Sequence, residues 1–504
     1  MAQRTMNDTW SVVITGEQWA LLHGHLFPGD GDEHGAILRC GVSESSRGTR
    51  LLVHDIVPAV DGIDYVDGQR GYRKLTAEFV ADTIDTCAED GLVYLAVHNH
   101  RGRNHVGFSS TDLASHKRGY PALLDINAGV PVGALVFADN AVAGDIWTSD
   151  GKRHAVTELR IVGRPRLTLT PEPVPPPRSD PTYDRQARIF GDRGQTILAG
   201  SKVAVVGLGG IGSLIAEYLA RLGVGELVFI DPDRIDPTNL PRVVGARRSD
   251  AWPLLQDERR PRWVQRLGAR LATPKVKIAA RLARQASKTV RITQVRRSVV
   301  DADVALLLTD CDHIFLAADS ALARRLVNSV THQYLIPHTQ VGSKVTVIDG
   351  AVADIFSVVR SSSPGGGCLQ CNDLIPPWRL TEEATSEVQR RRQRYVDDEN
   401  IHAPSVITLN AVTASRAVDD WLMTIGGLTD PAVSDDHWVA YHPLTDDVIE
   451  HAPATSPDCR HCGPSRLALG DAVSLLARPL TARETAKRRS HVWYLAGTAS
   501  RTRS

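Results

Sequence analysis

Two histidines and an aspartate stand close together in the first quarter of the chain. His98 and His100 lie in the segment HNHRGRNHVGFSSTD, which ends at Asp112. Histidines separated by one residue on an extended segment project to the same side, so both imidazoles can bind one cation. With Asp112 as a third ligand, a fourth position stays open for water, whose pKa a zinc ion lowers towards about 7. The pattern predicts a catalytic zinc site.

A glutamate and a serine complete this group. Glu33 lies upstream in DEHGAILRCG and is the candidate base that takes a proton from the water and passes it to a leaving amine. Ser109 is predicted to stabilise the oxyanion. The alternatives are a chance grouping or a scaffold of this kind that binds no metal. His105 and His116 lie nearby but fit no ligand spacing, which favours surface or core histidines.

The chain has seven cysteines, and four of them form two CxxC pairs. Paired thiols at this spacing usually hold metal in a reducing compartment, and two such pairs supply a closed tetrahedral site without a position for water. They predict a structural zinc site, with redox activity of one pair as the alternative. The four residues are Cys368, Cys371, Cys459 and Cys462.

A glycine-rich motif, GLGGIG, stands between a predicted strand and a predicted helix. In that context the backbone amides at the helix N-terminus bind phosphates. Asp231 ends the next predicted strand, about twenty residues further on, where a carboxylate grips ribose hydroxyls. Dehydrogenases share both features, so an NAD-dependent oxidoreductase is an alternative. The glycines are Gly207, Gly209, Gly210 and Gly212.

The residues that follow favour adenylation over hydride transfer. Asp233, Asn239 and Arg242 lie in DPDRIDPTNLPR, and Lys275 lies in TPKVKIAARLA. When a carboxylate attacks the α-phosphate of ATP, negative charge develops on pyrophosphate, and Arg, Lys and Mg²⁺ stabilise that charge. Asp319, after the buried strand in HIFLAADS, is the predicted magnesium ligand.

These residues require an α/β fold in two parts. Short apolar runs such as GAILRCG and GLVYLAVHNH alternate with a candidate helix, TAEFVADTIDTCAE, in the first part. In the second part KVAVVGLGG, IGSLIAEYLARLG and ELVFIDPD form a strand, a helix and a strand, which predicts a Rossmann-like, mostly parallel sheet. The proline-rich stretch 169–182 predicts a semi-rigid linker. We therefore expect domains at 1–168 and 183–470, and a C-terminal extension at 471–504.

The composition limits the partners. Of 504 residues, 42% are hydrophobic and 23% are charged, and 58 basic side chains balance 58 acidic ones. That balance gives no reason to expect nucleic acid. The chain shows no signal peptide and no run of about 18 apolar residues, so we expect no membrane partner and a cytoplasmic location.

The first group of residues resembles the JAMM/MPN (JAB) metallopeptidases, whose pattern is a glutamate, HxH, a spacer and SxxD. The resemblance covers residues of about 10–150 and implies zinc-dependent cleavage after the terminal glycine of ubiquitin-like proteins. Two departures are visible. The spacer between His100 and Ser109 is one residue longer than usual, and Arg101 stands where the family has proline.

The second group is similar to the ThiF/MoeB/HesA family and to the adenylation domains of ubiquitin-activating enzymes. YDRQARIFGDRGQ, GLGGIGS, DPDRIDPTNLPR, PKV and LAADS occur in the family's order, over residues of about 180–465. The resemblance implies that the glycine motif and Asp231 bind ATP. It also implies that Asn239, Arg242 and Lys275 contact the phosphates.

Two further implications depend on the same resemblance. The PKV context favours Lys275 over its neighbour Lys277 as the phosphate ligand. Arg185, in YDRQ, matches an arginine that enters the ATP site of a partner subunit, which implies a homodimer. Members that form a thioester carry a cysteine in the segment between Cys371 and Cys459, where this chain has none. The acyl-adenylate is therefore expected to pass to another acceptor.

Together the two resemblances imply adenylation of the C-terminal glycine of a ubiquitin-like or sulfur-carrier protein, coupled to zinc-dependent processing of that protein. A conjugating enzyme or a sulfur donor would act downstream. The alternatives are adenylation of a peptide or small-molecule carboxylate, and a regulatory protein with inactive sites. Arginines of the stretch 390–394 are expected to contact a substrate tail or to form a solvated helix.

Overall fold

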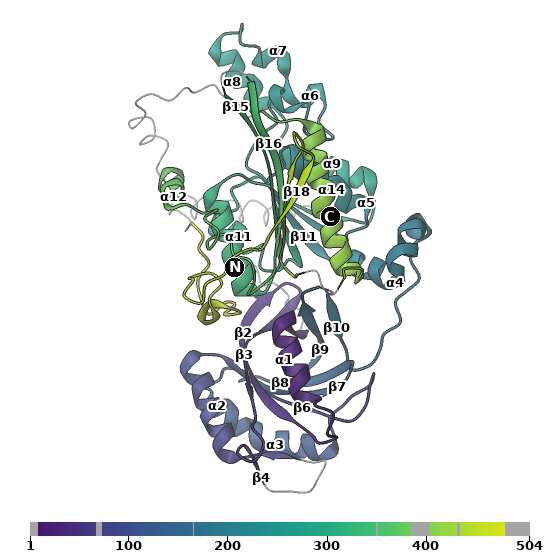
Figure 1. The fold of residues 1–504 in the computed structure, drawn as a ribbon, viewed down its shortest axis with the longest axis vertical. Helices are drawn as coiled ribbons and strands as arrows, with labels where there is room; N and C mark the ends of the chain where they lie inside the picture. Colours follow the sequence, from purple (N-terminus) through teal and green to yellow (C-terminus); the bar gives the residue numbers. More distant parts are fainter. Residues whose placement is uncertain are drawn as a thin grey trace, which may run out of the picture.

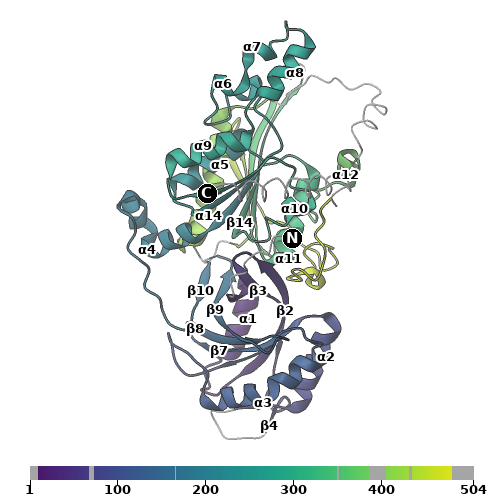
Figure 2. The same cartoon turned by 180° about the vertical axis from the view of Figure 1, so that it is seen from behind.

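The computed structural model shows two α/β bodies stacked along the long axis of the molecule (Figures 1 and 2). It describes residues 9–66, 73–164, 166–348, 351–384, 404–430 and 434–478. The arginines at 390–394 and most of the predicted C-terminal extension lie outside these residues. Within them, no helix is both long enough and apolar enough to cross a membrane.

The N-terminal body is built on one eight-stranded sheet. Its strands are β1 (Trp10–Thr15), β2 (Gly35–Ser45), β3 (Gly48–Pro58), β6 (Val93–Asn99), β7 (Val132–Ala138), β8 (Ala141–Trp147), β9 (Arg153–Val162) and β10 (Leu167–Leu169), and β4 (Tyr65–Val66) and β5 (Lys74–Leu75) form a separate ribbon. The order is β1-β3-β2-β6-β7-β8-β9-β10, and β1 also pairs with β9. The sheet therefore closes on itself, which leaves few unpaired strand edges.

Three helices cover this sheet from two sides. Successive side chains of a strand point to opposite faces, and β2 shows it: Leu38 packs in the core with α1 (Gly16–Leu26), whereas Ile37 packs in the core with α2 (Ala77–Asp90) and α3 (Ser110–Ile126). Both faces of this sheet are therefore buried, and for this reason its strands appear in the sequence as short apolar runs.

Each of these helices begins after a hydroxyl residue. The side chains of Thr15, Thr76 and Ser109 each accept a hydrogen bond from the backbone N–H three residues further on. This cap satisfies one of the unpaired amides of the first turn and places the start of each helix. Ser109 thus fixes the position of the helix that carries Asp112.

The second body has an eight-stranded mixed sheet. Its strands are β11 (Lys202–Val206), β12 (Glu226–Ile230), β13 (Arg291–Val295), β14 (His313–Leu316), β15 (His338–Ile348), β16 (Ala351–Ser362), β17 (His437–His442) and β18 (Asp447–His451). The order is β13-β12-β11-β14-β15-β16-β17-β18, with the first five parallel and the last three antiparallel. The predicted mostly parallel sheet is thus mixed, because β15 to β18 pair antiparallel, although α12 and α14 lie in the chain between β16 and β17.

Helices lie on both faces of this Rossmann-like sheet. They are η1 (Pro181–Tyr183), α4 (Asp184–Gly200), α5 (Gly210–Arg221), η2 (Pro237–Asn239), α6 (Arg248–Ala251), α7 (Pro253–Gln256), α8 (Arg262–Leu271), α9 (Lys275–Ala286), α10 (Ala302–Ala305), α11 (Ala321–Tyr334), α12 (Pro377–Ala384), α14 (Ile407–Gly426) and η3 (Pro464–Arg466). α5, α9 and α14 pack in one core with Phe229, whereas α11 packs in the other core with Val228.

The two bodies share an apolar core. Val13, Leu52 and Val162 of the N-terminal sheet belong to the same buried cluster as Ile314 and Ile336 of the second body. A linker that kept the bodies apart would expose this surface to water. The proline-rich stretch therefore connects two bodies that are packed together.

The predicted domain boundaries stay predictions. Strand β10 carries the N-terminal sheet to Leu169, and residues 170–180 contain no helix or strand. The chain then enters η1, where Asp180 accepts a hydrogen bond from the backbone N–H of Thr182.

A second connection comes from the far end of the chain. Residues 467–471, which we name the strap, lie between the two bodies. Gly470 forms a parallel bridge with Val42 of β2. On its other side, the strap donates from the backbone N–H of Ala468 to the carbonyl of His332 on α11, at 2.9 Å. The strap therefore joins the end of the second body to the N-terminal sheet.

Candidate functional sites

The glycine-rich loop follows β11 and opens α5, as predicted. Gly207 has a φ of +89°, and a Cβ there would lie 2.8 Å from the backbone of Ala317 and Ala318. A Cβ on Gly212 would lie 1.9 Å from the carbonyl oxygen of Gly207. Both contacts demand glycine, because only a residue without Cβ permits this close approach. The loop thereby places the first amides of α5 at the carboxyl edge of the sheet, where they can bind an anion.

Asp231 holds this loop in position. It directly follows β12 and is 4% exposed. Its two carboxylate oxygens accept hydrogen bonds from the backbone N–H of Leu208, at 2.7 Å, and of Asp233, at 2.8 Å. Burial raises the pKa of Asp231, while Lys275 and the two amides lower it. That Asp231 binds the ribose stays a prediction. In the structure, its carboxylate holds the glycine loop through the backbone N–H of Leu208.

The predicted cations lie around the same loop. Lys275 Nζ is 2.9 Å from Asp233 Oδ2, and the Lys275 backbone N–H donates to the Asp233 carbonyl at 3.0 Å. Lys277, the competing lysine, is exposed. The side chain of Arg242 lies beside the loop, since its Cδ is 3.6 Å from the position of a Cβ on Gly210. Its backbone N–H donates to the carbonyl of Asn239, which ends η2.

Asp319 lies next to the residues that pack against the same glycine loop. It follows Ala317 and Ala318, the two residues against which Gly207 packs, and it is exposed in the loop between β14 and α11. An exposed carboxylate beside a phosphate-binding loop has the chemistry of a Mg²⁺ ligand. The position of Asp319 therefore fits the Mg²⁺ ion for which it is the predicted ligand.

One residue beside the glycine loop, Asn410, was not predicted from the sequence. Asn410 of α14 is 1% exposed, and its Nδ2 lies 2.2 Å from the position that a Cβ on Gly210 would take. Ser343 of β15 donates a hydrogen bond to Asn410 Oδ1 at 3.1 Å. Asn410 therefore packs against the glycine loop at Gly210 and supports it. It lies some two hundred residues from the loop, and no local pattern marked it.

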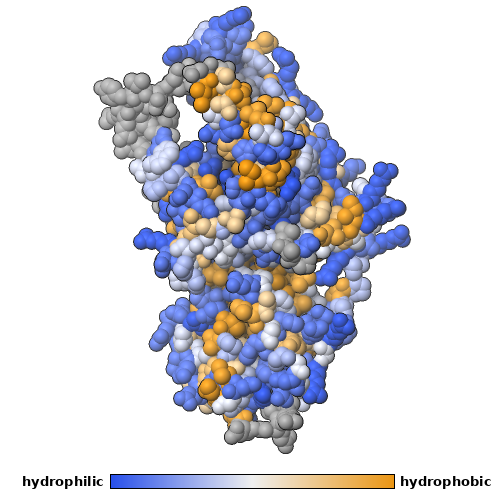
Figure 3. All heavy atoms as spheres, in the orientation of Figure 1, coloured by the Kyte–Doolittle hydropathy of each residue, from blue (hydrophilic) through white to orange (hydrophobic). Residues whose placement is uncertain are grey.

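Arg185 lies away from the glycine loop of its own chain. It is exposed in the first turn of α4, and the next residue, Gln186, donates to the carbonyl of Leu222 at the end of α5. The glycine loop is at the opposite end of that helix. α4 protrudes from the body and bends at Gly191, and hydrophobic atoms gather near it on the surface (Figures 1 and 3).

In the N-terminal body the histidines and the aspartate meet as predicted. His98 Nε2 and His100 Nε2 are 3.2 Å apart, and Asp112 Oδ2 lies 3.6 Å from the first and 3.4 Å from the second. Atoms that bind one zinc ion at about 2.0–2.1 Å in tetrahedral geometry are about 3.4 Å apart. The three side chains therefore fit a single zinc ion. Burial alone would raise the pKa of Asp112, but hydrogen bonds from His100, His98 and Ser109 hold it well below its usual value.

Glu33 and Ser109 border this group. Glu33 Oε1 is 3.9 Å from His100 Nε2, and burial raises the pKa of Glu33. The Ser109 hydroxyl donates to Asp112 Oδ2 at 2.7 Å, which orients that ligand. The hydroxyl proton of Ser109 is thus used in the hydrogen bond to Asp112. That Ser109 stabilises the oxyanion stays a prediction. Arg101 donates to the carbonyl of Gly31 at 2.8 Å and thereby links the two loops that border this group.

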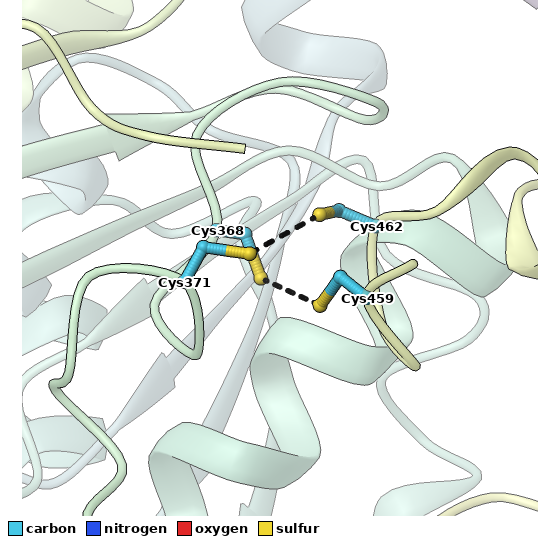
Figure 4. Close-up of side chains that lie close together, drawn as sticks. All are labelled: Cys368, Cys371, Cys459 and Cys462. Carbon is cyan, nitrogen blue, oxygen red and sulfur yellow. Dashed lines mark hydrogen bonds between the residues drawn. The ribbon is translucent and has the colours of Figure 1, made fainter. Parts of the chain in front are cut away.

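The four predicted cysteines form one cluster (Figure 4). The Sγ atoms of Cys368 and Cys459 are 3.9 Å apart, and those of Cys371 and Cys462 are 3.7 Å apart. All four sulfur atoms lie within 4.8 Å of one another. Thiolates that bind zinc at about 2.3 Å in tetrahedral geometry are about 3.8 Å apart. The cluster therefore fits a structural zinc ion.

Polar side chains around the cluster were not predicted. Asn328 Nδ2 donates to Cys368 Sγ at 3.2 Å. His332 accepts the Gly365 backbone N–H at Nδ1, and its Nε2 is buried without a hydrogen-bond partner among the described residues. Both residues lie on α11 and are fully buried. A donor such as Asn328 orients a metal-binding thiolate and stabilises its charge.

The Rossmann-like sheet, its glycine loop and the surrounding cations define the class of nucleotide-dependent adenylating proteins. The chain belongs to the ThiF family, whose profile matches residues 183–461, more than half of the 504 residues.

Relatives within this family match the same part of the chain. The SAMP-activating enzyme E1 of Haloferax volcanii is 27% identical over 278 residues, covering 54% of this chain and 84% of the relative. The molybdopterin-synthase adenylyltransferase of Escherichia coli is 25% identical over 285 residues, covering 56% and 95%. The sulfur carrier protein ThiS adenylyltransferase of Bacillus subtilis is 28% identical over 197 residues, covering 38% and 51%.

Proposed function

We propose that this chain uses ATP to adenylate the C-terminal glycine of a ubiquitin-like or sulfur-carrier protein. One observation carries the proposal: Lys275, Arg242 and Asp319 surround the glycine loop at the carboxyl edge of the parallel strands. Ligands of open α/β sheets bind at that edge. The substrate class is supported by the names of the three relatives, which act on protein substrates.

Each residue has a definite part in this reaction. The amides at the start of α5 bind phosphate oxygens, and Asp231 keeps the loop in the conformation that presents them. Lys275 and Arg242 stabilise the negative charge that develops on the pyrophosphate leaving group as the substrate carboxylate attacks the α-phosphate. Mg²⁺, held by Asp319, would add positive charge at the phosphates.

Pyrophosphate exchange tests this proposal. The chain is incubated with ATP, labelled pyrophosphate and a ubiquitin-fold protein that ends in glycine. We expect exchange only with that substrate, and none with the same protein lacking its last glycine. Exchange with short peptides or small carboxylates but not with the protein would favour the biosynthetic alternative. No AMP formation with any carboxylate would contradict the proposal.

A homodimer with shared sites is part of the proposal. Arg185 lies at the far end of α5 from its own glycine loop, so it would serve the loop of a second copy. Exposed Ile189, on the protruding helix α4, supports a partner there.

Subunit mixing tests the shared site. Arg185→Ala and Lys275→Ala chains are each expected to be inactive in pyrophosphate exchange. Equal mixing would give half heterodimers, each with one complete site, and thus about a quarter of wild-type activity in a two-fold symmetric dimer. Arg188→Ala, one turn further on α4, is the control and should keep full activity alone. No recovery after verified subunit exchange would show that Arg185 does not act across the interface.

The N-terminal body is proposed to be a zinc-dependent peptidase of the JAMM/MPN type. The spacing of His98, His100 and Asp112 supports it, because it suits three ligands of one tetrahedral ion. Zinc bound there would supply an acidified water. Glu33, whose raised pKa suits a proton carrier, would take the proton and deliver it to the leaving amine. One body would expose or release the carboxylate that the other activates.

The cysteine cluster is proposed to bind structural zinc and to hold the strap in place. Cys459 and Cys462 immediately precede the strap, so an ion bound by all four thiolates would fix where the strap leaves the second body. Metal binding of this kind contributes directly to folding.

Loss of one thiolate should therefore loosen the strap. In Cys462→Ser, we expect one zinc fewer per chain and tryptic cleavage at Arg460 or Arg466 at least about 10-fold faster, because local opening sets the rate of proteolysis. Zinc analysis and mass spectrometry of the fragments measure both effects. Cys311→Ala, a buried cysteine outside the cluster, is the control. Unchanged zinc content in Cys462→Ser would refute the assignment.

A further inference from the structure

We propose that a cavity between the two bodies binds a small anion with an apolar body. We name it the interdomain cavity. Its lining includes Arg50, Arg160, Arg166, Asp312, His338 and Trp421. It touches the first residues of β14 and β15, at the amino edge of the parallel strands. The glycine loop and Asp319 lie at the carboxyl edge, so the cavity is separate from the proposed nucleotide site.

The carboxylate of Asp312, which lines this cavity, pairs with three arginines. Asp312 is 2% exposed in its side chain, and it lies 2.6 Å from Arg160, 2.8 Å from Arg47 and 3.5 Å from Arg166. Glu158 is a second partner of Arg160, at 2.6 Å. No acidic group within the described residues other than Asp312 contacts Arg166. The positive charge of this arginine is therefore only partly neutralised.

Arg50 of β3 has no acidic partner among the described residues. Its Nη2 donates to the carbonyl of Thr309 and to Ser43 Oγ, and its Nε is buried without a hydrogen-bond partner. Burial lowers the pKa of Arg50, and burial together with the charge of Arg160 lowers the pKa of Arg166 to about 10. A buried cation without a full partner is costly, and an anion beside it removes that cost.

The rest of the lining is mixed. Asp420 and Asp435 also line the cavity, where the Arg164 side chain pairs with Asp420 and the Arg164 backbone N–H donates to Asp435. Val13, Val162, Ile336 and Trp421 give the cavity an apolar wall. His338 is completely buried, and its Nε2 has no partner within the described part of the chain, while its Nδ1 bonds to Thr331. Burial lowers the pKa of His338 to about 3, so it offers a neutral polar atom rather than a charge. A carboxylate or phosphate on a small apolar group matches this set.

Such a ligand would act on both bodies at once. Arg50 and Arg160 belong to the N-terminal sheet, whereas Asp312, His338 and Trp421 belong to the second body. A molecule that binds only when these walls are together stabilises the packed arrangement by mass action. The cavity would therefore couple the packing of the peptidase-like body on the adenylating body to the concentration of a metabolite anion.

Thermal unfolding with two probe anions tests the inference on the full chain. The unfolding midpoint is measured in 10 mM sodium benzoate, in 10 mM sodium phosphate, and in sodium chloride of the same ionic strength. Lys275→Ala is measured in parallel to exclude phosphate at the nucleotide crevice. The variants are Arg50→Gln combined with Arg166→Gln, each single variant, and Arg103→Gln, a surface arginine whose side chain is 80% exposed.

We expect a saturable rise of about 2–4 °C with benzoate in the wild type, in Lys275→Ala and in Arg103→Gln. A smaller rise with phosphate would show that the apolar wall contributes. The double variant should lose the rise, and its midpoint in chloride should be at least that of the wild type because two poorly paired charges are gone. If the double variant is unfolded, the single variants decide by the same criterion. An equal rise in the arginine variants, or no rise above chloride in the wild type, would overturn the proposal.

Discussion

Replacement of Lys275 with alanine is expected to slow carboxylate-dependent pyrophosphate exchange by about 100- to 1000-fold. The ammonium group lies beside Asp233, next to the carboxylate of Asp231 that holds the glycine loop. There it would stabilise charge on the leaving pyrophosphate, and the loss of one such group typically costs about this much. Pyrophosphate exchange at saturating substrate measures the effect.

The same substitution should leave the fold intact. The Lys275 side chain is 12% exposed, but that of its partner Asp233 is 62% exposed, so water screens the ion pair, and pairs screened in this way contribute only about 0–1 kcal/mol to stability. An unchanged unfolding midpoint with a large loss of exchange would therefore locate the effect in the reaction. Lys277→Ala, two residues further along α9 and exposed, is the matched control and should retain full exchange. Equal activity of the two variants would refute the assignment of Lys275.

Replacement of His100 with alanine is expected to abolish peptide-bond cleavage while leaving adenylation unchanged. With two of three ligands remaining, zinc would no longer be held, and cleavage of a fusion behind the terminal glycine of a ubiquitin-fold protein should fall at least about 1000-fold, since the metal supplies several kcal/mol of the catalysis. Metal analysis should show a decrease from two zinc ions per chain to one, because the cysteine cluster lies in the other body.

His105→Ala provides the comparison for this experiment. His105 lies five residues from His100 in the same loop region but is exposed and contributes no atom to the cluster. It should keep both zinc ions and full cleavage. Cleavage by the His100→Ala protein at the wild-type rate would mean that the histidine pair has no catalytic part, whatever the outcome for adenylation.

The elements around the candidate sites were predictable because their signals are local. An apolar run followed by GLGGIG specifies a strand, a tight turn and a helix, and the structure has β11, Gly207 and α5 in that order. The alternation of a strand places His98 and His100 on one side, and Asn99 between them points away to accept the backbone N–H of His34. Spacing of this kind is set by backbone geometry over a few residues.

Other parts of the sites depended on contacts between distant segments. Asn410 packs against a loop two hundred residues earlier in the chain. Asp312 pairs with Arg47, in the turn between β2 and β3, and with Arg160 on β9 of the other body. The residue types and their local periodicity do not state which segments become neighbours. The order of strands and the packing of helices decide it, so these contacts escaped the sequence analysis.

The sequence by itself determined the chemistry that each segment can perform: two imidazoles that share a cation, thiol pairs at metal spacing, and amides and cations for phosphates. Only the tertiary structure decided how these segments combine. It brought the two CxxC pairs together, separated Arg185 from its own glycine loop, and packed the two bodies around a cavity. The physical reason is that local geometry follows from the backbone, whereas long-range neighbours follow from burying one continuous apolar core.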